Sequence, residues 1–486
     1  MLSTTVDEAV SVLPMGRNTL AATPARYALT TALAVIVLLI ALYLKSPLLA
    51  LVAAAGIAGL LITIRHPVWA MSLLFASLPF EQPLFGKYAV VSLCASDVIA
   101  FLLLIALLKP LLQHQKLVIG PIALPLLIFC TVILSSAVIH YDGVPTLLAV
   151  SRAQLMTAAA ILVWTNFWTE GCEVKEMHRC LRAFLHGINL LSVICLLTYF
   201  SSGIEGAMYT LDINKNALGP TFGTGIVVTV CLLFSGSYHH ASGRAKNWER
   251  IWLAATLLGA SGGLFLTLSR SGWAATAAAI LFVALTGRKV LQLAVAAVPI
   301  FILMALLWSH LPETQRVYAG DISFSAPNAV TRLDLMRKSV AAFYESPWFG
   351  NGVGVIKDVD PHNLIALTLS ETGIVGLASF ALLTGAGFWT LRRASRAAGM
   401  SRMAQPLLMA GAGILVLTLV DSMLDIYWRR GVGYMSWSMV GMGTALLSRS
   451  VHRQPFVDPL FTDAASQKGS MFQNESTPEN IASARY

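Results

Sequence analysis

Long apolar runs alternate with short polar segments along most of the chain. About fourteen runs approach the roughly 20 apolar residues that a helix needs to cross a bilayer. They lie at 28–44, 47–64, 67–80, 89–108, 119–138, 146–168, 180–201, 216–235, 251–268, 271–287, 290–309, 362–391, 404–420 and 432–448. The pattern predicts an all-α, polytopic integral membrane protein with about 14 transmembrane helices.

The runs also predict how the chain is divided. One long polar interruption, 310–361, separates the first eleven predicted membrane helices from the last three, and it contains an amphipathic helical pattern. The predicted regions are an N-terminal segment 1–27, membrane helices 1–11 within 28–309, the loop 310–361, membrane helices 12–14 within 362–448, and a polar, disordered tail 449–486.

Basic residues fix the expected orientation. They recur in alternate loops, from Arg17 and Arg26 before the first run to Arg449 and Arg453 after the last, whereas the loops between hold few. Because cytoplasmic loops are enriched in Lys and Arg, both ends are predicted inside and 310–361 outside. No small-residue cleavage site follows the first run, which indicates an uncleaved anchor.

Composition agrees with this picture. The chain is 56% hydrophobic and 12% charged, whereas a soluble protein carries about 25% charged residues. The net charge of +9 is spread over loops as the orientation rule requires, and no compact basic domain is left for nucleic acid. We therefore expect membrane lipids, and no nucleic acid, as partners.

Polar residues concentrate between Thr331 and Glu371. Thr331 and Asp334 have the spacing of a capping box, which predicts a helix that begins there. Arg332 then falls in the first turn, where free backbone N–H groups and a guanidinium can bind phosphate. The alternative is a surface arginine on a solvated face. Pro347 is expected to end the helix.

A glycine-rich segment and a short polar motif follow. Gly350, Gly352 and Gly354 lie within GNGVG, which we interpret as a tight turn because no strand precedes it as in a nucleotide loop. Asp360-Pro361 is typical of a helix start. This places His362 and Asn363 at the outer membrane surface, where a neutral His can accept a proton from a hydroxyl or can simply be interfacial.

Three further ionisable residues lie inside predicted helices. Glu371 follows nine residues after His362 and faces the opposite side of a straight helix, which favours a structural hydrogen bond to a neighbouring helix. Asp97 and Arg152 lie at similar depth, which favours an ion pair. The alternative for Arg152 is contact with an anionic substrate.

Other outer-side candidates border neighbouring helices. Arg270 stands between two apolar runs with almost no loop, where it can bind a lipid diphosphate or a headgroup. Lys215 and Asn216 stand at the outer start of the eighth predicted membrane helix, 216–235. The last outer loop crowds together acidic, aromatic and basic residues, namely Asp421, Asp425, Tyr427, Trp428, Arg429 and Arg430. The aromatics fit an interfacial belt or can stack on a sugar.

These candidates gather on one side, whereas a transporter more often places them at the midplane. One-sided chemistry on a membrane-embedded substrate is therefore favoured. Three histidines, His140, His310 and His362, lie on that side without carboxylates at ligand spacing, so no catalytic metal is expected.

In several of these stretches the chain resembles the O-antigen ligase/polymerase superfamily. The resemblance rests on SRSGW at 269–273, TRLDLMRKSVAAFYESPWFGNGVG at 331–354 and PHNLIALTLSETGIVGL at 361–377, in that order. The matched core spans about 216–391. The resemblance implies a GT-C-like membrane fold and glycan transfer at the periplasmic face of the bacterial inner membrane, with no cofactor.

The resemblance also implies roles for residues. The donor would be a glycan on undecaprenyl diphosphate, and the acceptor a glycan or lipid-A-core hydroxyl. Arg270 and Arg332 would hold the diphosphate, and His362 would act as base or position the acceptor. Substrate contacts are expected from Asn363, Lys215, Asn216 and Arg152.

The choice within the superfamily depends on a short stretch. Residues 214–219, NKNALG, resemble the HKN-x-x-G stretch of exopolysaccharide polymerases, although Asn replaces the first His. We favour a polymerase over an O-antigen ligase. A polysaccharide or solute transporter is the alternative from another class, and a non-catalytic scaffold is less favoured still. A chain-length regulator is a possible partner.

Overall fold

The computed structural model describes residues 66–80, 94–112, 120–143, 174–235, 244–313, 327–354, 361–397, 403–425 and 432–451, with a few isolated positions besides. Within these ranges the chain is helical and contains no strand. The all-α prediction is therefore confirmed for the part of the chain that is described.

Each predicted apolar segment that falls on these ranges coincides with a helix. The three segments 28–44, 47–64 and 146–168 lie almost wholly outside them, so the number of membrane helices stays a prediction. The helices that match predicted segments are α3 (Pro67–Ser77), α4 (Ala95–Leu112), α5 (Ala123–Ile139), α8 (Val174–Met208), α9 (Lys215–Ser235), α10 (Arg244–Leu266), α11 (Arg270–Gly287), α12 (Val290–His310), α15 (Leu364–Arg396), α16 (Ala404–Leu424) and α17 (Val432–Val451).

Five of the described spans are long and apolar enough to cross a membrane. They are Val174–Asp212, Lys215–Phe234, Val290–His310, Leu364–Arg396 and Ala404–Leu424. The first includes α8 and the short 3-10 helix η3 (Thr210–Asp212). These spans make the chain an integral membrane protein, as the sequence predicts.

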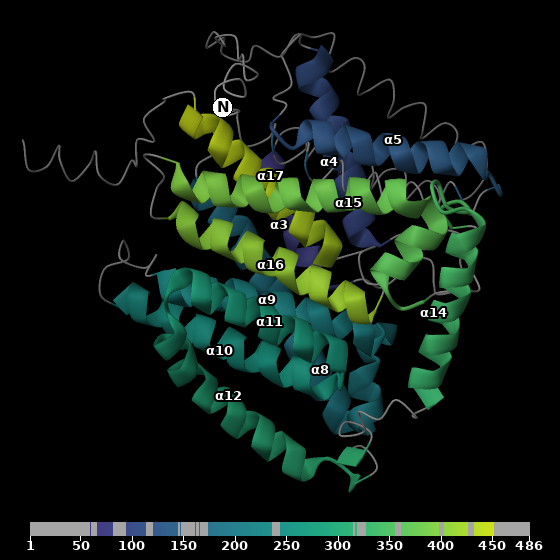
Figure 1. Cartoon of the computed structure of the whole chain (residues 1–486). Helices are drawn as coiled ribbons and strands as arrows, with labels where there is room; N and C mark the ends of the chain where they lie inside the picture. Colours follow the sequence, from purple (N-terminus) through teal and green to yellow (C-terminus); the bar gives the residue numbers. More distant parts are fainter. Residues whose placement is uncertain are drawn as a thin grey trace, which may run out of the picture.

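The helices form a bundle around α9, α11 and α16, which contact one another (Figure 1). α8 and α10 pack on α9, and α12 packs on α10 and α11. α15 and α17 pack on α16, with α5 against α15 and α3 against α8. α9 is the most deeply enclosed of the candidate spans, since 89% of its apolar window is buried within the protein.

Small residues allow the central helices to approach closely. A Cβ added to Gly272 of α11 would lie 2.8 Å from the Cα of Gly219 in α9. A Cβ added to Gly413 of α16 would meet Val283 and Val227 at 2.8 and 2.9 Å. Lipid offers no hydrophobic drive between helices, so such backbone contacts supply much of the packing.

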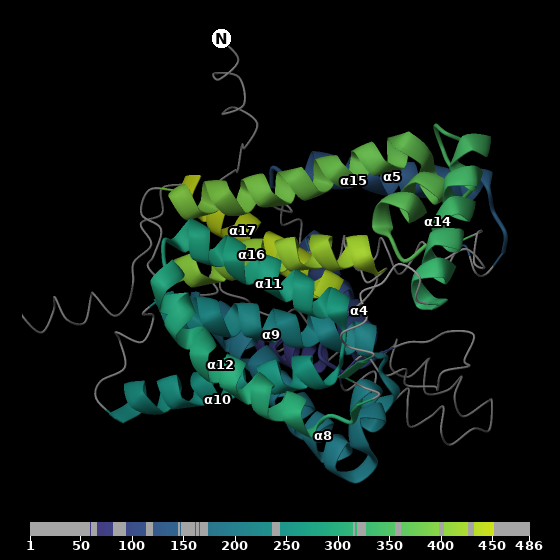
Figure 2. The same cartoon turned by 60° about the horizontal axis from the view of Figure 1, so that its bottom comes forward.

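The helix α14 (Pro327–Glu345) stands at one end of the bundle, across the direction of α15 (Figure 2). It begins four residues before Thr331, so the predicted capping box is wrong. Arg332 consequently lies inside the helix instead of among the free N–H groups of its first turn. The helix ends two residues before Pro347, which confirms that stop.

The segment after α14 is locked against a kink in α15. The backbone N–H groups of Asn351 and Gly352 donate to the carbonyl oxygens of Ser370 and Glu371, each at 2.9 Å. In return, the N–H of Ile374 donates to the Pro347 carbonyl at 2.9 Å. This backbone-to-backbone interlock fixes where α14 sits relative to the start of α15.

Glycine makes the interlock possible. Gly373 has φ 67° and ψ −164° inside α15, a conformation essentially confined to glycine. A Cβ there would lie 2.4 Å from the carbonyl carbon of Trp348, and one on Gly350 would lie 2.3 Å from that of Glu371. The two glycine motifs of the sequence are therefore two halves of one contact.

Candidate functional site

Three ionisable side chains meet at the end of the bundle where α14 lies. The His362 Nδ1 atom is 2.9 Å from Asp425 Oδ1, and the Arg332 Nη2 atom is 3.4 Å from Asp425 Oδ2. Arg332 Nη1 also donates to the Leu424 carbonyl at 2.7 Å. We call Arg332, Asp425 and His362 the charge cluster.

Three separate segments supply the charge cluster. Asp425 is the residue at which α16 ends, and its N–H donates to the Asp421 carbonyl at 2.7 Å. Arg332 comes from α14. His362 lies in the short segment before α15 and has a left-handed φ of 48°, a conformation that is uncommon for a residue with a side chain and often found at functional sites.

Asn363 holds the segment that carries His362. Its Oδ1 accepts from the Ala366 N–H at 3.0 Å, which makes it the cap of α15. Its Nδ2 donates to the Met423 carbonyl at 2.9 Å. The prediction that Asp360-Pro361 starts the helix is wrong, because Leu364 is its first residue. This leaves His362 outside the helix and beside the end of α16.

Exposure differs across the charge cluster. The Asp425 side chain is 8% exposed, whereas those of His362 and Arg332 are 33% and 41% exposed. The buried carboxylate is thus shared between two cationic or proton-donating groups that remain open to a ligand. Because Nδ1 of His362 faces an acceptor, it carries the proton in the neutral ring, and Nε2 is left as an acceptor.

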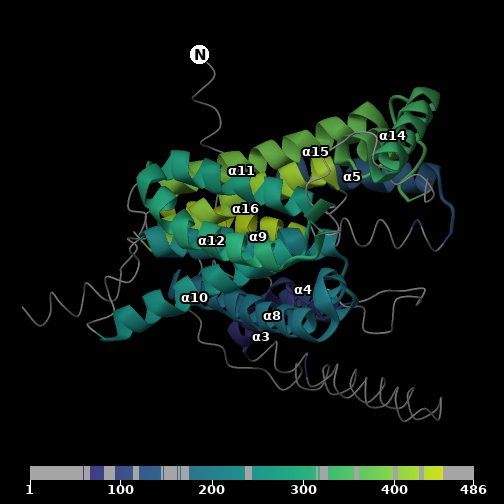
Figure 3. The ribbon, with the colours of Figure 1, turned by 90° about the horizontal axis from the view of Figure 1, so that it is seen from below.

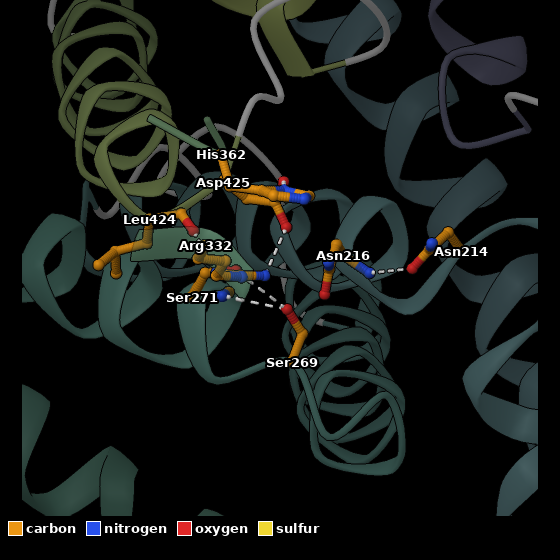
Figure 4. A network of polar contacts seen from close by, with 9 residues as sticks. Asn214, Asn216, Ser269, Ser271, Arg332, His362, Leu424 and Asp425 are labelled. Atoms are coloured by element: carbon orange, nitrogen blue, oxygen red, sulfur yellow. Dashed lines mark hydrogen bonds and ion pairs between the residues drawn. The ribbon is translucent and has the colours of Figure 1, made fainter. Parts of the chain in front are cut away.

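The starts of α9 and α11 lie next to the charge cluster (Figure 4). Ser269 caps α11 by accepting from the Gly272 N–H at 3.3 Å, so Arg270 is the first helical residue. Asn214 Oδ1 accepts from the Asn216 N–H at 3.0 Å at the start of α9. Two helix N-termini at one place favour an anion there.

A second carboxyl group lies one turn before Asp425. Asp421 of α16 is 1% exposed, and its surroundings include Ser271, Asp425 and Arg332. Neither of its carboxyl oxygens has a partner within ordinary hydrogen-bond geometry among the described residues, and the Ser271 side chain is the hydroxyl near enough to approach one. Asp421 therefore lies between the start of α11 and the charge cluster.

The glycine-rich turn does not offer its amides to a ligand. The Gly350 N–H donates to Ser346 and the Gly354 N–H to Glu371 Oε1 at 3.0 Å, while those of Asn351 and Gly352 form the interlock. These bonds confirm the prediction that the segment is a tight turn and not a phosphate-binding loop. The Glu371 side chain thus bonds this turn, while its main-chain carbonyl reaches α5 by accepting from Ser136 Oγ at 3.1 Å.

The predicted site residues are brought together to different degrees. Arg332, His362 and Asn363 meet directly at the end of α16. Arg270, with Lys215 and Asn216, starts the two neighbouring helices α11 and α9. Arg152 lies outside the described residues, and so does its predicted pairing with Asp97; the described Asp97 Oδ2 accepts from the Cys94 N–H at 2.8 Å.

Asp425 is the member of the charge cluster that the sequence did not single out. The sequence places it among the residues of the last outer loop, and in the structure it is the extended residue directly after α16. One signal was present: two acidic residues four apart, Asp421 and Asp425, at the end of an apolar run. Ionisable residues at such depth are expensive and usually functional. Among the described residues, no group of three His, Cys, Asp or Glu side chains could hold a metal ion.

The helical membrane bundle and its polar cluster at one end define a class, and a family comparison specifies it. Residues 253–381 match the family model described as O-Antigen ligase, so this part of the chain is similar to that family. The match includes Arg270, Arg332, His362 and Asn363, whereas Asp425 lies beyond it. No curated protein matches the chain.

The match agrees with the resemblance noted in the sequence over residues 253–381, and the candidate spans are those of an integral membrane protein.

Proposed function

We propose that this protein is a polymerase that joins glycan repeat units carried on undecaprenyl diphosphate, as in exopolysaccharide or O-antigen synthesis. The observation that carries the proposal is the charge cluster. A histidine held by a buried carboxylate, beside an arginine with N–H groups to spare, is suited to activate a hydroxyl next to an anionic leaving group.

In the proposed reaction, His362 accepts the proton from the acceptor hydroxyl at Nε2. The hydroxyl oxygen then bonds to the anomeric carbon of the donor glycan, and the bond from that carbon to the diphosphate oxygen breaks. Asp425 accepts a hydrogen bond from Nδ1–H and stabilises the positive ring that forms. The diphosphate leaves with the electron pair of the broken bond.

Arginines would stabilise the charge that develops on the diphosphate. Arg332 uses one N–H of each terminal nitrogen on the Leu424 carbonyl and on Asp425, and a guanidinium has five N–H donors in all. Arg270 would contribute from the first turn of α11, where the helix N-terminus also favours an anion. Asn363, Lys215, Asn216 and Arg152 are proposed to contact the substrate.

The proposed setting is the periplasmic face of a bacterial inner membrane, with both chain ends in the cytoplasm. It rests on the distribution of basic residues in the sequence. The partners would be the lipid-linked glycan and a growing glycan acceptor, with a chain-length regulator as a further partner. The mechanism proposed here requires neither a metal nor a cofactor.

Deletion of the gene tests polymerase against ligase. We expect single repeat units to accumulate on the lipid carrier, as seen by mass spectrometry of extracted undecaprenyl-linked glycans. Long polymer left on the carrier, with none on the lipid-A core, would show the ligase instead. An unchanged carrier pool would contradict both and favour a transporter.

The role of His362 is tested by His362→Ala in membranes supplied with lipid-linked repeat units. We expect transfer to fall by about 10²–10⁴-fold, the usual contribution of a general base. His310→Ala is the matched control, because His310 ends α12 and, among the described residues, bonds only within its own turn, to the Leu306 carbonyl and Ser309. Full activity of His362→Ala would remove the base assignment.

A further inference from the structure

The opposite ends of α11, α15 and α16 enclose a groove far from the charge cluster. α11 begins beside the cluster and runs for 18 residues to Gly287, or about 27 Å at 1.5 Å per residue. α15 begins after His362 and ends at Arg396, and α16 returns from Ala404. Figure 3 shows α14 at one end of α15 and the bundle continuing away from it.

The groove, which we call the far groove, has a volume of about 740 Å³. Its walls are mainly apolar and include Phe282 of α11, Phe388 of α15, and Leu408 with Ala412 of α16. The two phenylalanine rings meet edge to face, with centroids 6.4 Å apart. Such walls fit a hydrocarbon chain.

The rim of the far groove is cationic. Arg392 and Arg396 line it from one face of α15, four residues apart, and both are exposed. Neither forms an ion pair with the described residues, in contrast to Arg332 in the charge cluster. Like charges at this spacing repel each other slightly, so an external anion would relieve the repulsion.

A neighbouring arginine behaves differently. The Arg393 guanidinium lies 5.0 Å from the centre of the Trp389 ring, on the same turn of α15. A stacked arginine is engaged with an aromatic face. Arg393 is thus engaged with an aromatic ring, whereas Arg392 and Arg396 line the groove.

A second, smaller cavity adjoins the far groove. It has a volume of about 220 Å³ and shares the lining residues Gln405 and Met409 with the groove. It reaches between α9, α11 and α16 to Cys231 and Val283, and Lys289 stands at its edge. The Lys289 Nζ donates to the Phe234 carbonyl, which fixes this third cation in place.

We propose that the far groove and the adjoining cavity bind an anionic phospholipid with two acyl chains. The phosphate would lie between Arg392 and Arg396, which can hold its oxygens in a fork. One acyl chain would follow the phenylalanine wall, and the other would enter the cavity past Met409. Basic pockets between helices at a membrane surface commonly hold such lipids.

The test uses the purified full-length protein in neutral detergent. Dioleoyl phosphatidylglycerol and dioleoyl phosphatidylcholine are titrated separately, and binding is followed by native mass spectrometry and by the thermal unfolding midpoint. We expect phosphatidylglycerol to bind at least tenfold more tightly. Glycerol phosphate, which has no acyl chains, is expected to give no shift of the midpoint; an equal shift would show a free-anion site and overturn the lipid assignment.

Two variants separate the charge from the cavity. Arg392→Gln combined with Arg396→Gln should weaken phosphatidylglycerol binding about 30-fold, at roughly fivefold for each basic residue near a membrane surface. Ala412→Phe should fill the groove and weaken binding of the same lipid without a change of charge. The unfolding midpoint of each variant without lipid establishes first that it is folded.

Arg250→Gln is the matched control. Arg250 is an exposed arginine near the start of α10, at the same end of the bundle but away from the groove. We expect it to bind phosphatidylglycerol as the unaltered protein does. Equal affinity for the two phospholipids, or equal weakening by all arginine variants, would overturn the proposal and indicate unspecific surface charge.

Discussion

The two ends of the central helices carry arginines in opposite circumstances. At the end with α14, Arg332 shares the buried Asp425 carboxylate with His362. At the other end, Arg392 and Arg396 line a groove, and the described residues offer them no acidic partner. Both ends contain cations, but only one has its counter-charge built into the fold.

The difference bears on what each end can do. A paired arginine is held in a fixed position by the protein, which is what catalysis requires, since the donors must be in place before charge develops. An arginine without an internal partner gains most from an anion that arrives from outside. The paired end is therefore suited to chemistry and the unpaired end to binding.

The largest effect should come from removing the counter-charge at the paired end. Asp425→Asn keeps the size of the side chain but leaves Arg332 and His362 without their carboxylate. We expect transfer of lipid-linked repeat units to fall by about 10²–10⁴-fold, because the histidine loses the group that orients it. Single-turnover assays in membrane vesicles would measure this. An effect below threefold would show that the pairing is incidental.

A smaller effect should follow from weakening the interlock that positions α14 and its Arg332. Gly373→Ala forces a side chain into a conformation that costs about 1–3 kcal/mol and pushes it against Trp348. We expect a lower thermal unfolding midpoint and reduced transfer, because α14 must shift with Arg332. Gly385→Ala is the control on the same helix, since nothing lies within 4 Å of its added Cβ; it should be neutral or stabilising by up to about 1 kcal/mol. Equal midpoints for both variants would contradict the interlock.

The smallest effect at this end should come from Asp421→Asn. The chemical change is the same as at Asp425 and lies one helical turn away, but among the described residues the Asp421 oxygens make no ion pair, and the Ser271 hydroxyl that lies near them can also hydrogen-bond an amide. Burial of a carboxyl without a partner is unfavourable, so we expect an unchanged or higher unfolding midpoint and transfer within about threefold. A loss as deep as that of Asp425→Asn would place Asp421 in the reaction.

Much of the fold could be predicted from the sequence because lipid imposes a simple rule. A helix must be long and apolar to satisfy its backbone in a bilayer, and even the short segment 67–80 coincides with α3. Helix starts were predicted less well. The caps at Thr331 and Asp360 were inferred from local patterns, whereas α14 begins at Pro327 and α15 after Asn363.

The candidate site could be predicted only in part. Arg332 and His362 stand out because they are polar residues at the edges of apolar runs. Asp425 required knowledge of where α16 ends, since it contacts Arg332, 93 residues away in the sequence, and His362, 63 residues away. The role of Gly350 and Gly373 could not be predicted from the sequence either. Each glycine is required by the backbone that packs against it, at Glu371 for Gly350 and at Trp348 for Gly373.

The interlock between the glycine turn and α15 has a consequence for hybrid proteins. Investigators who exchange the segment around α14 between related proteins would naturally cut just before the helix at Leu364. That boundary separates two backbone surfaces, around Gly350 and Gly373, that fit only each other. A working hybrid should take residues 327–375 as one block, because the transplantable unit is the loop together with the first three turns of the helix that follows.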